Sequence, residues 1–131
     1  MQISELEVFT FKKAYSIPNV ALYDTLGPET SEFILNHAEI PILICSIDKV
    51  QEMLSIAHKC PKLKSIIVLK SLFKENLDPM IAFKKWGEQV GVYVIEFDEI
   101  IERGKSQNRP LILPAPDDFY CISYTSGRRN Y

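Results

Sequence analysis

Residues 65–69 read Ser-Ile-Ile-Val-Leu, and this short apolar run decides the fold class. The run has the length of a β-strand, and its aliphatic side chains are not interrupted by alternating polar ones. A continuous apolar run of this length is typical of a strand that is covered on both faces, as in a parallel sheet. The sequence therefore predicts a buried strand here.

Two further strand-like runs, residues 42–45 and 92–97, lie before and after it. The segments between these runs are long enough for helices. The first of them has apolar residues at i, i+3, i+4 and i+7, namely Val50, Met53, Leu54 and Ala57. Strands that alternate with such helices predict one α/β domain, in which helices cover both faces of a three-layer parallel sheet.

Turn and capping residues set the expected boundaries of the helices. Asp48, with Gln51 three residues later, predicts a capping-box start, and Asp78-Pro79 predicts a cap followed by a first-turn proline. Gly91 is expected to end the latter helix, whose inner face is predicted to carry Phe83, Trp86 and Val90. The other expected elements are a helix over 2–15, a strand at 21–23, a helix over 28–39 with Phe33, Ile34 and Ala38 inward, a helix over 98–103 closed by Gly104, a proline-rich loop over 105–118 and a last strand at 119–124.

Composition excludes several classes of protein. The chain has 131 residues, a size that fits one domain. Its net charge of −2 gives no electrostatic footprint for nucleic acid. No apolar run reaches the ~18–20 residues needed to cross a bilayer, so we expect no transmembrane segment.

The cysteines and histidines do not form a recognisable site. Cys45, Cys60 and Cys121 are an odd number without metal-ligand spacing, so we expect neither a disulfide framework nor a metal site. His37 and His58 have no acid or thiol at catalytic spacing. We therefore assign no catalytic residue and no metal ligand to the chain.

Two other polar groups are interpreted as structural. Tyr23-Asp24-Thr25 is expected to form a turn from strand to helix, stabilised by the short polar side chains of Asp24 and Thr25. Glu96, Asp98 and Glu99 are expected to mark the end of a strand and the cap of the next helix.

Thr125, Ser126 and Gly127 follow the last expected strand and have the composition of a phosphate-binding loop. A dinucleotide-binding fold would carry its glycine fingerprint after the first strand instead. A P-loop ATPase would show Gly-x4-Gly-Lys-Ser/Thr before a helix. Neither pattern occurs in this chain.

Two longer stretches resemble the adenylate-forming enzymes. Residues 114–127, Pro-Ala-Pro-Asp-Asp-Phe-Tyr-Cys-Ile-Ser-Tyr-Thr-Ser-Gly, resemble the approach to the ATP-phosphate loop of that family. Residues 20–29, Val-Ala-Leu-Tyr-Asp-Thr-Leu-Gly-Pro-Glu, and the continuation at 33–39 resemble a signature of its long-chain fatty acyl-CoA synthetases. The resemblance extends over residues 2–127, which implies that 1–131 is part of an AMP-binding N-terminal domain.

The resemblance implies a reaction and its cofactors. In the family a fatty-acid carboxylate attacks the α-phosphate of ATP, diphosphate leaves, and coenzyme A then displaces AMP. The complete enzyme would use ATP, Mg²⁺ and coenzyme A with a fatty acid as substrate. By the same resemblance Thr125, Ser126 and Gly127 would contact the ATP phosphates.

The sequence departs from the family pattern after Gly127. The family continues with Ser/Thr-Thr-Gly-x-Pro-Lys-Gly, whereas this chain continues with Arg-Arg-Asn-Tyr, so residues 124–127 represent a truncated phosphate-loop motif. We therefore expect a fragment that is inactive alone and binds no cofactor usefully. The alternative hypothesis is a non-catalytic α/β interaction or regulatory module derived from the same scaffold.

Two further expectations concern the chain in the cell and in solution. The family implies an intracellular location, which would be the peroxisome, the endoplasmic reticulum or the cytoplasm. An edge at the last strand that carries Phe119, Cys121 and Ile122 predicts self-association.

Overall fold

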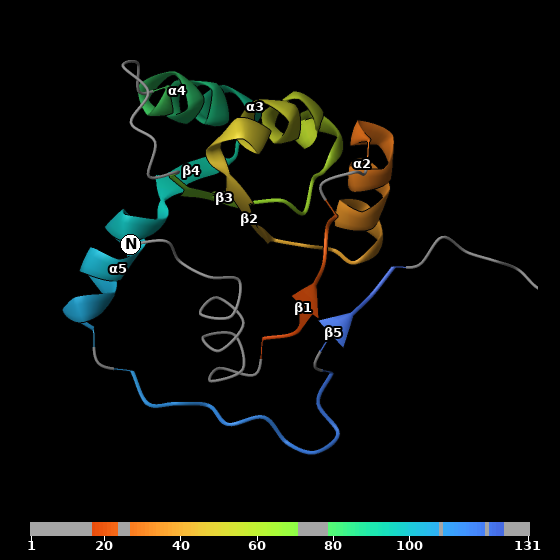
Figure 1. Ribbon diagram of the computed structural model, residues 1–131, viewed down its shortest axis with the longest axis vertical. Coiled ribbons are helices and arrows are strands. Elements are labelled where there is room, and N and C mark those ends of the chain that lie inside the picture. The colour runs from red at the N-terminus through yellow and green to blue at the C-terminus, as the bar shows by residue number, and fades with distance from the viewer. Residues whose placement is uncertain (1–16, 24–26, 71–78, 108, 120, 125–131) are drawn as a thin grey trace, which may run out of the picture. The chain divides into compact units, whose positions relative to one another are not determined.

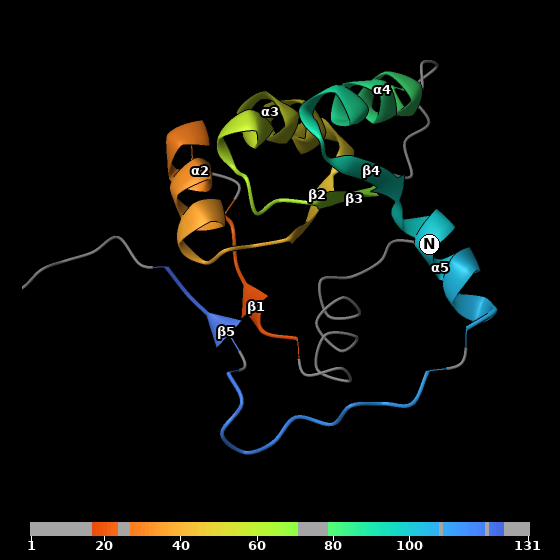
Figure 2. The same cartoon turned by 180° about the vertical axis from the view of Figure 1, so that it is seen from behind.

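The computed structural model describes residues 17–23, 27–70, 79–107, 109–119 and 121–124. The described residues fall into two compact units, one within 27–107 and the other made of 17–23 and 109–124. Figure 1 shows the helices and strands, and Figure 2 shows them from behind. The helix expected over residues 2–15 lies outside the described residues.

The first unit is built on a three-stranded parallel sheet in the order β2–β3–β4. Ile66 of the central strand pairs in register with Leu43 on one side and Val94 on the other. A helix lies in the connection between neighbouring strands, as parallel pairing requires. The predicted parallel α/β architecture is therefore confirmed. The bounds of the strands are Ile42–Ser46 for β2, Ser65–Leu69 for β3 and Tyr93–Glu96 for β4.

One face of this sheet carries the core. Helices α3 (Ile47–Ile56) and α4 (Met80–Val90) both lie on it (Figure 1), because right-handed crossovers in a constant direction put their helices on one side. Ile66 and Val68 of the central strand are fully buried there. The predicted inner face of α3 is confirmed, since its four members are all buried: Val50, Met53, Leu54 and Ala57. Ala57 belongs to a short 3₁₀ turn, Ala57–Lys59, that follows the helix.

The opposite face is less completely covered. Helix α5 (Phe97–Lys105) lies on this side, where the Arg103 guanidinium donates a hydrogen bond to the Tyr93 hydroxyl at 3.2 Å. Tyr93 and Ile42 remain 52% and 53% exposed, whereas Ile95 is buried. Helices therefore flank both faces as predicted, but only one face is packed into a closed core.

Helix α2 (Pro28–His37) begins at the predicted proline and packs against α3. Ile34 and Leu35 are buried, and the prediction that Phe33 faces inward is wrong because its side chain is 58% exposed. Phe33 lies about 200° around the helix from Leu35, so the two cannot face the same neighbour. The helix ends before Glu39, whose φ of 49° belongs to the left-handed region.

Two glycines shape α4. A Cβ atom at Gly87 would lie 2.5 Å from the Val92 carbonyl oxygen and 2.6 Å from Val94 Cγ2. Only glycine therefore allows this close approach between α4 and the strand that follows it. Gly91 ends the helix as predicted, with a φ of 74°. The predicted inner residues of this helix are half-buried: Phe83, Trp86 and Val90.

Helix starts and ends differ from some predictions. Helix α3 begins at Ile47 with Ser46 as its N-cap, so Asp48 lies in the first turn instead of at the cap. Pro79 is the N-cap of α4 rather than a first-turn residue, and the Asp78 expected at that cap lies outside the described residues. Helix α5 continues through Gly104, because ion pairs between Glu and Lys or Arg one turn apart stabilise its last turn.

The strands of the second unit are shorter than predicted. The strand expected at 21–23 is displaced to β1, Asn19–Val20, and the strand expected at 119–124 is reduced to β5, Cys121–Ile122. The described residues between Lys105 and β5, where the sequence predicts a loop, carry neither helix nor strand. No described residue of this unit is buried.

Candidate phosphate-loop site

The second unit contains the strand that leads to the predicted phosphate loop. Strands β1 and β5 form a two-stranded parallel sheet, with Asn19 opposite Cys121 and Val20 opposite Ile122 (Figure 1). Because the strands are parallel, the chain leaves both of them at the same edge. The predicted loop thus follows the carboxyl edge of a parallel pair, which is where ligands bind in α/β folds.

Five described residues follow the two strands at this edge, 21–23 after β1 and 123–124 after β5. Ser123 and Tyr124 follow β5, and Ser123 is exposed while Tyr124 is half-buried. Tyr23 lies three residues beyond the end of β1 and is 56% exposed. Thr125, Ser126 and Gly127 lie outside the described residues, as do Asp24 and Thr25. Their assigned roles therefore stay predictions.

A tight turn directs the chain into β5. The Asp118 N–H donates to the Ala115 carbonyl oxygen at 3.1 Å, and Pro116 occupies the second position of the turn. Proline favours that position because its ring fixes φ. The Asp118 carboxylate also accepts a hydrogen bond from the Ala115 N–H at 2.8 Å. This acidic turn, which precedes the predicted phosphate loop, is therefore stabilised by hydrogen bonds between its own residues.

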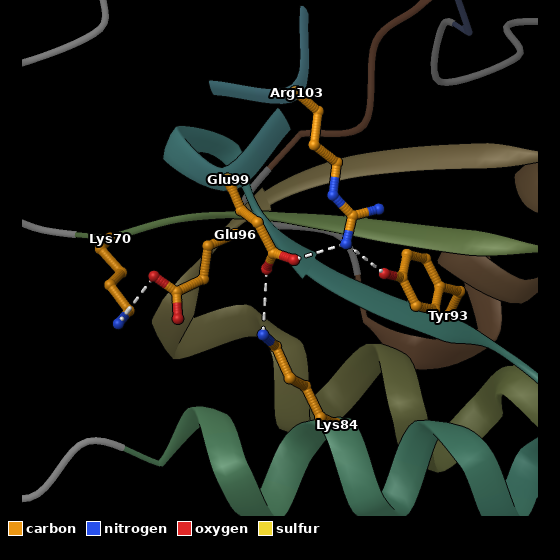
Figure 3. Close-up of polar contacts among 6 residues, drawn as sticks. All are labelled: Lys70, Lys84, Tyr93, Glu96, Glu99 and Arg103. Atoms are coloured by element: carbon orange, nitrogen blue, oxygen red, sulfur yellow. Dashed lines mark hydrogen bonds and ion pairs between the residues drawn. The ribbon is translucent and has the colours of Figure 1, made fainter. Parts of the chain in front are cut away.

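A charged cluster lies at one end of the first unit's sheet (Figure 3). Glu99 accepts hydrogen bonds from Lys84 Nζ at 3.1 Å and from Arg103 at 2.6 Å. The hydrogen bond from Lys84 is the largest cause that lowers the pKa of Glu99. Beside them, Lys70 Nζ lies 2.9 Å from a Glu96 carboxylate oxygen.

These contacts connect elements rather than form a reactive pair. Glu99 joins α5 to α4 through Lys84, and Arg103 joins α5 to β4 through Tyr93. A carboxylate whose pKa is lowered stays ionised, which does not suit a general acid at neutral pH. Glu96 ends β4 and is the N-cap residue of α5, as predicted, without a side-chain cap hydrogen bond. The network itself was not predicted, although the i,i+4 spacing of Glu99 and Arg103 signals one of its contacts.

A shallow hollow of about 660 Å³ lies on the outer side of α2. His37 and Phe33 stack there with ring centroids 5.3 Å apart. Lys59 Nζ lies 3.1 Å from the Glu32 carboxylate in the same hollow. The residues that line this hollow include no thiol or hydroxyl nucleophile. The lining residues are Glu29, Glu32, Phe33, Asn36, His37 and Lys59.

The thiols of the first unit have environments that suppress reactivity. Burial raises the pKa of the Cys45 thiol to about 12, and the Asp48 carboxylate adds to the rise. Burial also raises the pKa of Cys60, with a further contribution from Glu32. Because the thiolate is the nucleophile and the metal ligand, neither cysteine is suited to catalysis. The third thiol, Cys121, is exposed in β5 and lies 3.6 Å from the Ser123 hydroxyl.

Within the described part of the chain, no group of three or more His, Cys, Asp and Glu side chains is arranged to hold a metal ion. None of the helices that the structure describes is long and apolar enough to cross a membrane.

A family model described as AMP-binding enzyme matches residues 14–127 of the chain. The match includes both strands of the second unit and the predicted phosphate-loop residues. It also includes the whole of the first unit.

Curated relatives include several long-chain acyl-CoA synthetases. Long-chain-fatty-acid–CoA ligase 5 of Mus musculus is 36% identical over 128 residues, which cover 95% of this chain and 17% of the ligase. Peroxisomal long chain acyl-CoA synthetase 6 of Arabidopsis thaliana is 32% identical over 114 residues, covering 87% of this chain and 15% of that protein. The chain therefore spans only about a sixth of the length of these relatives.

Solved structures of adenylating enzymes share the fold. The A domain of a carboxylic acid reductase from Segniliparus rugosus, in complex with AMP and a co-purified carboxylic acid, superimposes with a TM-score of 0.75. It is 19% identical, and the match covers 92% of this chain and 20% of that one. The anthranilate CoA ligase AuaEII, in complex with anthranoyl-AMP, gives a TM-score of 0.54 at 20% identity, over 85% of this chain and 18% of that one.

Proposed function

The chain belongs to the AMP-binding enzyme family, and we propose that it is the part of a long-chain fatty acyl-CoA synthetase that leads into the ATP-phosphate loop. The proposed reaction of the complete protein converts ATP, a long-chain fatty acid and coenzyme A into acyl-CoA, AMP and diphosphate. The observation that carries the proposal is the parallel β1–β5 pair, whose carboxyl edge leads directly to the Thr125-Ser126-Gly127 motif.

The proposed role of this segment is to hold the phosphates of ATP. The hydroxyls of Thr125 and Ser126 can donate to phosphate oxygens, and Gly127 lets the backbone approach them closely. Holding the phosphates in place lowers the barrier by positioning the reacting groups and by neutralising the charge that develops. The described residues offer no cluster of metal ligands, so this segment is given no part in binding Mg²⁺. We likewise propose that coenzyme A binds to other parts of the complete protein.

A chimera tests the proposal directly. Residues 17–127 would replace the matching segment of the mouse ligase, to which the chain is 36% identical. We expect the chimera to form palmitoyl-CoA, and we expect Thr125→Ala with Ser126→Ala in the chimera to lower that activity at least tenfold. A folded chimera that binds coenzyme A but forms no acyl-CoA would contradict the proposal.

We propose that the 131-residue chain is inactive by itself. The support is its length, since it spans only 15–17% of the relatives that carry the whole reaction. With radiolabelled palmitate, ATP and coenzyme A, the purified chain should give no acyl-CoA above the background without protein. Acyl-CoA formation that scales with the amount of chain would refute this.

The alternative function is a non-catalytic interaction or regulatory module. The core between the β2–β3–β4 sheet and helices α3 and α4 favours this alternative, because every buried residue of the described part of the chain lies in the first unit. The exposed Phe119 and Ile122, at 82% and 39%, favour self-association of the chain when it is alone. Light scattering on the purified chain distinguishes the two proposed functions. Aggregation would support the proposal that the chain is a segment of a synthetase, and a stable monomer at ~0.1 mM would support the non-catalytic module.

We propose an intracellular location for the protein: the peroxisome, the endoplasmic reticulum or the cytoplasm. The support comes from relatives, of which the Arabidopsis thaliana synthetase 6 and the Penicillium brevicompactum acyl-CoA ligase 891 are named as peroxisomal. Imaging of the tagged complete protein against organelle markers tests this proposal. Secretion into the medium would contradict it.

A further inference from the structure

We propose that the hollow on the outer side of α2 is a docking surface for a partner protein, and that it takes a short basic segment of that partner through an arginine side chain. The guanidinium group would lie on the Phe33 ring and pair with the Glu29 carboxylate. The hollow belongs entirely to the first unit. It uses none of the residues assigned to ATP, so the inference does not depend on the proposed function.

Five of the six lining residues come from one stripe of α2. They recur at i, i+3, i+4, i+7 and i+8, which is the spacing of side chains on a single helix face. The stripe consists of Glu29, Glu32, Phe33, Asn36 and His37. The buried Ile34 and Leu35 occupy the rest of the helix surface. The fold therefore uses one side of α2 for its core and leaves this stripe for another contact.

The far wall of the hollow is Lys59, which is tied to α2 at two points. Its carbonyl oxygen accepts a hydrogen bond from the Asn36 side-chain amide at 3.0 Å, and its Nζ lies 3.1 Å from a Glu32 carboxylate oxygen. The hollow has a volume of about 660 Å³. Sites for small organic ligands have volumes of ~300–1,000 Å³, so there is room for a long side chain and the backbone beside it.

Phe33 supplies an accessible aromatic surface. Its ring stacks on His37, with centroids 5.3 Å apart and an angle of 17° between the planes. Phe33 is nevertheless 58% exposed. A planar guanidinium group stacks on such rings and is attracted by their negative faces.

The charges of the lining select a cationic partner. Lys59 neutralises Glu32, whereas none of the ion pairs among the described residues includes Glu29, which is exposed. With histidine neutral, the lining thus has one negative charge in excess. Glu29 lies one helical turn before Phe33, so one cation can contact both. Arginine fits better than lysine, because its flat group can also pair with a carboxylate through two N–H groups.

The chain makes a contact of the same kind with its own arginine elsewhere (Figure 3). The Arg103 guanidinium donates to the Glu99 carboxylate at 2.6 Å and to the Tyr93 hydroxyl at 3.2 Å, so it joins a carboxylate to an aromatic side chain. The hollow on α2 has the carboxylate and the aromatic ring, but its lining includes no arginine. The missing member is what the partner would supply.

Nuclear magnetic resonance of the 131-residue chain with ¹³C-labelled phenylalanine tests the proposal. The probe is the peptide acetyl-Gly-Arg-Gly-amide in excess, and the control peptide has citrulline in place of arginine, which keeps the shape and removes the charge. The Phe33 ring signal, identified by its loss in Phe33→Leu, should shift with the arginine peptide and not with the citrulline peptide. Phe119 is 82% exposed and serves as the internal control, because the neighbouring Asp118 carboxylate already accepts a hydrogen bond from the Ala115 N–H.

Two matched carboxylate variants locate the charge that is recognised. Glu29→Gln should weaken binding of the arginine peptide about threefold to fivefold. Glu88→Gln, which removes an exposed carboxylate from α4, should leave that binding unchanged. Both positions are exposed, so neither substitution disturbs the core.

The other outcomes would overturn the proposal. Equal shifts with the citrulline peptide would show that charge is not recognised, and equal binding of a lysine peptide would show that the guanidinium is not. A Phe119 signal that moves as far as that of Phe33 would show that any exposed ring responds. A Phe33 signal that changes with the concentration of the chain alone would identify a second copy as the occupant. The absence of any shift would show that the hollow binds no basic segment.

Discussion

The two units of the chain differ in what holds them together. All buried side chains of the described residues lie in the first unit. The second unit has strands of two residues each and no buried residue among those described. Two-stranded pairs are marginally stable by themselves in water, and ligand-binding segments often come from the least stable parts of a fold. The framework and the candidate site are therefore different parts of this molecule.

Thiol labelling should give the largest difference between the two units. Cys121 is exposed in the second unit, whereas Cys60 is 2% exposed in the first. Cys60 should react only when its unit opens, so under native conditions we expect it to label at least a thousandfold more slowly, given opening free energies of about 5 kcal/mol. Mass spectrometry of labelled peptides over time measures both rates. Similar rates for the two thiols would show that the first unit has no stable core.

Truncating one side chain in each unit gives the next largest effect. Leu54 is fully buried, and Leu54→Ala should lower the free energy of unfolding by about 2–5 kcal/mol. Ile122 is 39% exposed, and Ile122→Ala should cost less than about 1 kcal/mol. Urea unfolding followed by the fluorescence of Trp86, the single tryptophan, measures both. Equal costs would mean that the second unit is packed as tightly as the first.

Two glycine substitutions locate the close packing within the first unit. A Cβ at Gly87 would meet the Val92 carbonyl oxygen at 2.5 Å, so Gly87→Ala should destabilise by about 1–3 kcal/mol. Gly104 also lies within a helix but has nothing within 4 Å of its added Cβ. Gly104→Ala should therefore stabilise by up to about 1 kcal/mol. The same urea titration shows whether each substitution raises or lowers the free energy of unfolding. A stabilised Gly87→Ala variant would contradict the close approach of α4 to the strand that follows it.

The charged cluster should give the smallest effect, because its members are partly exposed. The pKa of Glu99 is lowered in the folded state, so its contribution is present above the ordinary carboxyl pKa and is lost as pH falls through the folded value. Glu99→Gln should therefore lower the unfolding midpoint at pH 7 more than at about pH 2.5. In a Lys84→Met background that difference should shrink, and labelling of Cys121 should not change. A pH-independent difference would show that Glu99 acts through packing.

The sequence predicts best the features that depend on neighbouring residues. The apolar run at 65–69 and the spacing of Val50, Met53, Leu54 and Ala57 predict the strand and the buried helix face, and both are confirmed. Phe33 was misplaced, because adjacent apolar residues leave more than one possible inner face for a short helix, and packing against α3 selected Ile34 and Leu35.

Features that depend on distant residues were harder to predict. Periodicity cannot identify strands of two residues, so β1 and β5 are defined by their pairing alone. The contact of Lys84 with Glu99 joins two elements whose relative position is set by the sheet between them. The assignment of Thr125, Ser126 and Gly127 came from resemblance to a family, since three small residues after a strand do not specify a ligand by themselves.

The pairing of Asn19 with Cys121 also fixes an order of events during synthesis of the chain. About 100 residues separate the two partners, so the entropy of closing so long a loop must be offset before the pair can form. A nascent chain emerges from its N-terminus, and the strands β2, β3 and β4 can assemble as soon as α5 has left the ribosome. During that time β1 has no partner, because Cys121 has not yet emerged from the ribosome. The candidate site is therefore the last part of this segment to form, and a chaperone that holds β1 during translation would act on the site without affecting the core.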